Sequence, residues 1–152
     1  MMSLRTLGIA LVLLAVTGRG AAAQPDPALT GAVRAYDPAA AVSTDPALIH
    51  TEDFNGDGRP DVAAVLESEA KSALVIFHRT PAGFRAFSLY ASLPPGPLEL
   101  RVVPPGRHRV LGPQGTIDVS APALELIFPG KSSAMYVWGA NRYQVYPTEN
   151  YR

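Results

Sequence analysis

The chain has 152 residues, of which 47% are apolar, and it carries 13 Lys and Arg residues against 13 Asp and Glu residues. This length suits one compact domain and is too short for a complete β-propeller or a two-domain enzyme. The balanced charge argues against a nucleic-acid partner, which would need clustered Lys and Arg to displace counterions from phosphate. Cysteine is absent, which excludes a disulfide framework, a Cys-ligated zinc site and a thiol nucleophile.

The first 23 residues have the pattern of a secretory signal peptide. A basic start that includes Arg5 precedes an apolar run from Leu7 to Val16, and small residues follow at 21–23. The apolar run is too short to span a bilayer, which takes about 20 residues. We therefore expect cleavage after Ala23, export to the periplasm or the cell exterior, and a mature chain without a membrane span.

The remaining chain divides in two by composition. Residues 24–44 are rich in Ala, Pro and Asp, which predicts a linker with a short helix around 28–36. Residues 45–152 carry short β-branched and aromatic runs between Gly and Pro clusters, which predicts a single β-rich domain. The predicted strands are 48–52, 61–67, 73–79, 84–90, 99–103, 116–119, 123–128, 134–138 and 142–146.

The predicted fold class is mainly β: an antiparallel hairpin meander, either a sandwich or a half-open barrel, with a short N-terminal helix. In the last hairpin, Ala134, Tyr136 and Trp138 share one face of the strand while Met135 and Val137 share the other. Because both faces are apolar, we expect such strands to be covered on both sides. The aromatic residues of the domain then form either its core or a sugar-stacking surface; they are Phe77, Phe84, Phe87, Tyr136, Trp138, Tyr143 and Tyr146.

The segment from residue 53 to residue 61 has the most specific pattern in the chain. Oxygen-bearing side chains fall at its positions 1, 3, 5 and 9, and glycine stands at position 6. Calcium takes six to eight hard oxygen ligands, which a tight loop of this kind supplies. The pattern predicts one Ca²⁺ ion with water completing the shell; the alternative is a metal-free Asp/Asn/Gly turn. The predicted ligands are Asp53, Asn55, Asp57 and Asp61 by side chain, and Arg59 by its backbone carbonyl.

Position 12 of the loop is Ala64, inside an apolar strand, where an EF-hand would need a carboxylate on a helix. The pattern instead resembles the calcium loop of FG-GAP and VCBS repeats, in which D-x-[DN]-x-D-G-x-x-D precedes a hydrophobic strand. The match covers about residues 49–77 and includes one such loop, so it implies the site and the same ligands but no propeller. The whole chain resembles small secreted proteobacterial proteins with a single repeat of this type.

Other residue types give weaker signals. The histidines at 50, 78 and 108 lack the spacing of a zinc site, and no serine-nucleophile motif occurs. We therefore expect no enzymatic activity, but a calcium-binding domain with a structural or binding role toward an unknown protein or glycan partner. The alternative is an envelope hydrolase or hydrolase inhibitor acting on saccharide or peptide. A pocket joining Glu99 or Glu125 to a histidine would favour the alternative, and a flat aromatic face would favour binding.

Overall fold

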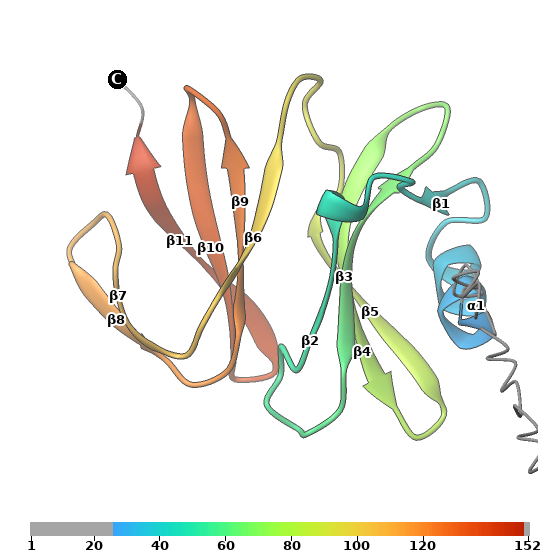
Figure 1. The fold of residues 1–152 in the computed structure, drawn as a ribbon, viewed down its shortest axis with the longest axis horizontal. Helices are drawn as coiled ribbons and strands as arrows, with labels where there is room; N and C mark the ends of the chain where they lie inside the picture. The colour runs from blue at the N-terminus through green and yellow to red at the C-terminus, as the bar shows by residue number, and fades with distance from the viewer. Residues whose placement is uncertain (1–25, 151–152) are drawn as a thin grey trace, which may run out of the picture.

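The computed structural model describes residues 26–150, with side chains through residue 148. It is mainly β, with antiparallel sheets and no closed barrel, as predicted (Figure 1). The predicted short helix is present as α1 (Pro27–Tyr36), which Asp26 caps by accepting a hydrogen bond from the Ala28 amide. The predicted signal peptide lies outside the described residues. Within those residues, no helix is both long and apolar enough to cross a membrane.

The first sheet, sheet A, has five antiparallel strands. Their order is β1-β3-β4-β5, and β2 also pairs with β3. The central strand β3 has six consecutive buried residues, which explains its nearly unbroken apolar sequence. The strands are β1 (Ala41–Val42), β2 (Ile49–Glu52), β3 (Asp61–Glu67), β4 (Ser72–Thr80) and β5 (Gly83–Tyr90), and the 3-10 turn η1 (Pro46–Leu48) precedes β2.

The second sheet, sheet B, has four antiparallel strands in the order β11-β10-β9-β6. Between β6 and β9 the chain makes a separate two-stranded hairpin, β7–β8. The strands are β6 (Glu99–Val103), β7 (Gly106–Arg109), β8 (Thr116–Val119), β9 (Ala123–Phe128), β10 (Ser132–Gly139) and β11 (Arg142–Asn150).

The two sheets pack against each other as a sandwich around a shared core. Alternate residues of sheet A meet alternate residues of sheet B there, and Tyr136 of β10 belongs to this core as its alternation predicts. The buried members of this inter-sheet core are Phe54, Ala63, Val65, Leu74, Ile76, Leu93, Leu100, Leu124, Leu126 and Tyr136.

Each sheet also has a covered outer face, so the prediction of strands apolar on both sides is confirmed. Helix α1 covers sheet A, with Val33 buried against Phe77 and its neighbours. The β7–β8 hairpin covers sheet B through Val110 and Val119, which pack with Met135. Figure 1 shows the helix and the hairpin at opposite ends of the molecule.

Two short strands were missed in the sequence. β7 contains the polar run Arg107-His108-Arg109, which has no apolar alternation that would predict a strand. It is a strand because it pairs with β8. β1 lies in the segment assigned to a linker, where Val42 pairs with Leu66 of β3. Since α1 and β1 both pack on sheet A, the boundary at residue 45 does not separate two packing units within the described residues.

Candidate metal centre

The predicted calcium loop joins β2 to β3 and is held to the inter-sheet core by Phe54. This side chain is fully buried, although both of its neighbours in the loop are polar. The loop also approaches the connection before β9, because a Cβ atom on Gly56 would lie 3.5 Å from the Cβ of Ala121. The loop therefore lies at the junction of the two sheets. The sequence analysis did not predict the anchoring role of Phe54. The pattern that indicates it is a single apolar residue within an otherwise polar loop.

The side chains of the loop fold it by accepting hydrogen bonds from its own amides. Oδ1 of Asp53 and Oδ1 of Asn55 both accept from the Asp57 amide, at 2.9 and 3.0 Å, so these two oxygens lie close together. Oδ2 of Asp53 accepts from the Gly58 amide at 2.8 Å, and Asp57 accepts from the Arg59 amide at 2.9 Å. Gly58 has φ +83°, a conformation that a side chain would strain.

Asp61 begins β3 and connects the loop to β4. Its carboxylate is fully buried and accepts hydrogen bonds from the Arg79 amide of β4 at 2.8 Å and from the Asn55 amide at 3.3 Å. Burial raises the pKa of Asp61 to about 6, against the lowering effect of the two amides, and repulsion from Asp57 and Asp53 adds to the rise. The four predicted side-chain ligands are therefore brought into one hydrogen-bonded turn.

The side chains of this turn carry hard oxygen donors, the type of ligand that calcium takes. In residues 26–150, no three His, Cys, Asp or Glu side chains converge in a geometry that would hold a metal. The three aspartates of the predicted set, Asp53, Asp57 and Asp61, therefore do not form such a group, and the set also includes the amide oxygen of Asn55 and a backbone carbonyl. The salt bridges of the described side chains do not include Asp61. A buried carboxylate without a cationic side chain is what a cation from solution would neutralise.

A small hollow of about 210 Å³ adjoins the loop. The loop contributes Asn55, Asp57 and Arg59 to its lining, and residues of β4, β5, β10 and the β10–β11 turn complete the wall. Four rings form a cluster at this place, with His78 and Phe87 of sheet A against Trp138 and Tyr143 of sheet B, at centroid distances of 4.4 to 6.0 Å.

His78 is the buried titratable member of this ring cluster. Its Nε2 atom and the Tyr143 hydroxyl are 2.6 Å apart in a hydrogen bond. Burial lowers the pKa of His78 to about 4, and Arg85 lowers it further, while Asp57 and Asp53 act in the opposite direction. The imidazole is therefore neutral at pH 7 and bridges the two sheets as a hydrogen-bonding aromatic ring.

The predicted aromatic group separates into two sets. Phe77 and Tyr136 are core residues, with 0% and 4% of their surfaces exposed. Phe87, Trp138 and Tyr143 are half-buried at the sheet junction. The aromatic residues are thus divided between the core and a partly exposed cluster.

A second polar cavity, of about 390 Å³, lies between the outer face of sheet B and the β7–β8 hairpin. Glu125 of β9 is buried there and accepts from Arg101 at 3.0 Å and 2.5 Å, and from the Thr148 hydroxyl at 2.5 Å. His108 also lines the cavity and is hydrogen bonded through Nε2 to the Pro104 carbonyl at 2.7 Å. Glu99 does not line it.

No protein-family model, curated protein or solved structure matches the chain.

Proposed function

We propose that the protein is an exported calcium-binding β-rich domain in which one ion fixes the β2–β3 loop, and that its role is structural or binding rather than catalytic. The observation that carries the proposal is Asp61, a fully buried carboxylate that receives amides but no cationic side chain. Three carboxylates in one short loop repel one another, and a divalent cation converts that repulsion into attraction.

The connections of the loop explain why an ion there would act as a scaffold. Asp61 is bonded to the backbone of β4, and Phe54 packs in the core between the sheets. An ion held by Asp53, Asn55 and Asp61 would therefore join the loop, sheet A and the sheet junction. Removing it would loosen the loop without interrupting a chemical step.

Calorimetry of the mature chain with and without Ca²⁺ tests the proposal. An ion that binds only the folded state stabilises it by about 2.7 kcal/mol at a hundredfold excess over its dissociation constant. Mg²⁺ should stabilise less, because it demands octahedral geometry and keeps its water.

Asp53→Ala and Asp57→Ala should abolish the Ca²⁺ effect. Glu52→Ala is the matched control, since Glu52 is exposed on β2 just before the loop. An unchanged midpoint in millimolar Ca²⁺ would refute the assignment.

The alternative of a hydrolase or hydrolase inhibitor has one observation in its favour, the cavity that Glu125 shares with His108. Both oxygens of Glu125 are engaged, by Arg101 and Thr148, so the group is held as a structural anion. Glycoside hydrolysis also uses two carboxylates, and Glu125 is the one carboxylate among the described residues of the lining. Turnover of a saccharide or peptide reporter that is lost in Glu125→Gln would establish the alternative.

A further inference from the structure

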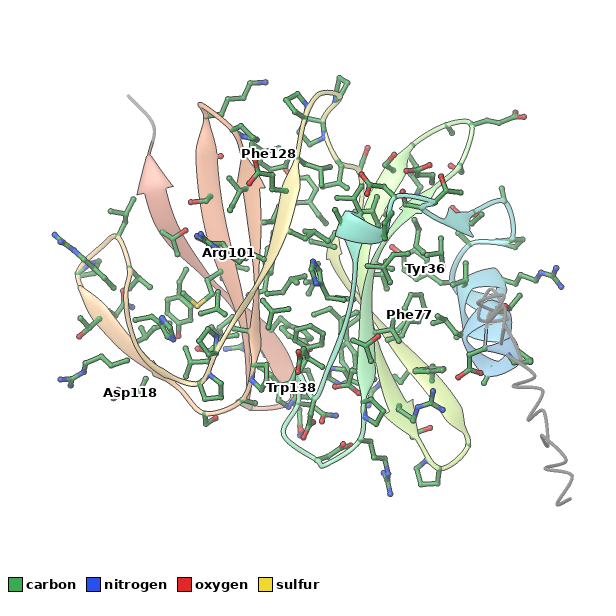
Figure 2. All side chains as sticks on the ribbon, in the orientation of Figure 1. Tyr36, Phe77, Arg101, Asp118, Phe128 and Trp138 are labelled. Carbon is green, nitrogen blue, oxygen red and sulfur yellow. The ribbon has the colours of Figure 1, made fainter. Side chains whose placement is uncertain are left out.

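The hollow beside the calcium loop is built from three chain segments that are distant in sequence. The loop contributes Arg59, the β4–β5 hairpin contributes Arg85 and Phe87, and the β10–β11 turn region contributes Trp138 and Asn141. Figure 2 shows Trp138 at the end of the molecule where the two sheets meet. A ligand in this hollow would touch both sheets and the loop together.

The aromatic side of the hollow suits a molecule with an apolar face. Phe87 and Trp138 have ring centroids 5.0 Å apart with their planes at 76°, so the two rings form a corner. Both rings line the hollow while remaining half-buried. A sugar ring has C–H groups on its faces and hydroxyls around its edge, and aromatic side chains bind such faces while polar groups fix the edge.

The polar side of the hollow has a net positive charge, because its lining carries Arg59, Arg79 and Arg85 against one carboxylate, Asp57. The guanidinium of Arg59 is 3.9 Å from Asp57 and 48% exposed, which makes this ion pair weak. Arg85 is exposed on β5 and lies with Cζ 5.0 Å from the centroid of Phe87. Asn141 is exposed at the tip of the turn, in a left-handed conformation with φ +59°. Guanidinium groups bind carboxylates with two parallel hydrogen bonds, so this wall selects an acidic ligand.

We propose that this hollow binds an acidic saccharide, with a uronic-acid carboxylate on Arg59 and Arg85 and the sugar ring against Trp138. The proposal rests on the binding role proposed above. None of the side chains assigned to the saccharide is a predicted side-chain ligand of the ion; Arg59 is shared only through its backbone carbonyl. Because Asn55 and Asp57 belong to both the loop and the hollow, ordering of the loop by Ca²⁺ should strengthen saccharide binding.

Trp138 provides the probe for the test, because the chain has one tryptophan. The mature protein is titrated with a short oligomer of galacturonic acid while tryptophan fluorescence is recorded. The same oligomer with its carboxyls reduced to alcohols is the neutral control, and a peptide rich in Asp and Glu represents the other class of acidic ligand. We expect saturable fluorescence change with the acidic oligomer alone. Equal binding of the neutral oligomer, or preferential binding of the peptide, would overturn the proposal.

Variants then locate the site. Arg59→Gln and Arg85→Gln should each weaken binding about tenfold or more, because each removes a hydrogen bond between charged groups. Arg107→Gln is the matched control, since Arg107 is an exposed arginine on the β7–β8 hairpin and should leave binding unchanged. Trp138→Phe, measured by titration calorimetry, should weaken binding while the thermal midpoint shows that the fold persists. Unchanged affinity in both arginine variants would overturn the assignment.

Repeating the titration in chelator separates this proposal from the calcium assignment. If Ca²⁺ leaves the thermal midpoint unchanged but the acidic oligomer still binds through Arg59 and Arg85, the calcium assignment fails and the saccharide site stands. If Ca²⁺ stabilises the domain but no oligomer perturbs Trp138 or produces heat, the saccharide site fails and the calcium assignment stands.

Discussion

Each sheet of the sandwich buries one carboxylate on an inner strand, and the two carboxylates have different bonding partners. Glu125 of β9 is bound by the guanidinium of Arg101, which is 64% exposed, and by the Thr148 hydroxyl. Asp61 of β3 receives two backbone amides, and its pKa is raised by burial and, to a smaller extent, by two nearby carboxylates. Sheet B therefore carries its own counter-charge, while sheet A has a buried anion suited to a cation from solution. The difference distinguishes a structural ion pair from a candidate metal site.

The largest effect should come from removing the anchor of the Asp61 loop. Phe54→Ala should lower the free energy of unfolding by about 3–5 kcal/mol, because it leaves a cavity in the inter-sheet core. It should also weaken the Ca²⁺ effect, since the loop loses its attachment to that core. Denaturant unfolding with and without Ca²⁺ measures both effects. Phe128→Ala, a half-buried ring at the far end of sheet B, is the control that should leave the Ca²⁺ effect intact.

The pH dependence of the calcium-free domain should reveal two opposing groups at the Asp61 site. The pKa of Asp61 is raised from 3.8 to about 6 on folding, so its contribution lowers stability as pH rises from about 4 to 6. The pKa of His78 is lowered from 6.5 to about 4, so its contribution raises stability over nearly the same range. Each is worth about 3 kcal/mol. In chelator the two contributions therefore oppose each other, and the net slope of stability with pH should be smaller than either contribution alone.

Single substitutions should separate the two slopes. His78→Asn leaves the Asp61 contribution unopposed, so stability should fall as pH rises from 4 to 6. Asp61→Asn leaves the His78 contribution, so stability should rise with pH. Chemical denaturation at several pH values in chelator measures the slopes. A flat profile in both variants would contradict the burial effects on which the two pKa values depend.

The Glu125 site should respond more weakly and independently of Ca²⁺. Glu125→Gln should cost about 1–2 kcal/mol, because it weakens a charge-assisted hydrogen bond whose arginine partner is largely in water. The increase in thermal midpoint caused by Ca²⁺ should be the same as in the unsubstituted protein. The comparison with Asp61→Asn, which should lose that increase, is made in one calorimetric series. A smaller Ca²⁺ effect in Glu125→Gln would show that the two carboxylates are coupled.

The smallest effect is expected on the hairpin that covers sheet B. Arg107 and Asp118 form a 3.6 Å ion pair in which both side chains are largely exposed. Such pairs contribute between 0 and about 1 kcal/mol, so Arg107→Gln should change the free energy of unfolding by less than about 0.5 kcal/mol. Denaturant unfolding at low and high salt measures this value. A loss as large as that of Glu125→Gln would contradict the contrast between exposed and buried pairs.

Local patterns in the sequence were enough for most of the fold. Apolar runs bounded by Gly and Pro placed β3 and β9 with the observed bounds, because each strand is apolar on both faces. Strand β7 was missed because its pairing with β8 depends on contacts distant from its own residues. The segment with α1 and β1 is predicted as a linker with a short helix; the helix is present, and the segment is fixed by Val33 under sheet A and by the pair of Asp26 with Arg79.

The candidate site was predictable to a different extent. The spacing of Asp53, Asn55, Asp57 and Asp61 identified residues that one turn brings together, since the loop is local in sequence. The hollow beside it was not predictable, because Trp138 and Arg85 reach it from different sheets. The aromatic pattern alone also gave no way to separate Tyr136, which is core, from Trp138, which is at the junction.

The edge strand β11 has a consequence for how this chain behaves among its own copies. An exposed edge offers unpaired amides and carbonyls that recruit a strand from another molecule and start aggregation. Pro147 supplies no amide to such a strand, and its carbonyl already accepts from the Leu111 amide at 2.8 Å. Pro147→Val would restore an amide donor to the edge. We expect that variant to form intermolecular sheets at concentrations where the unsubstituted chain remains monodisperse.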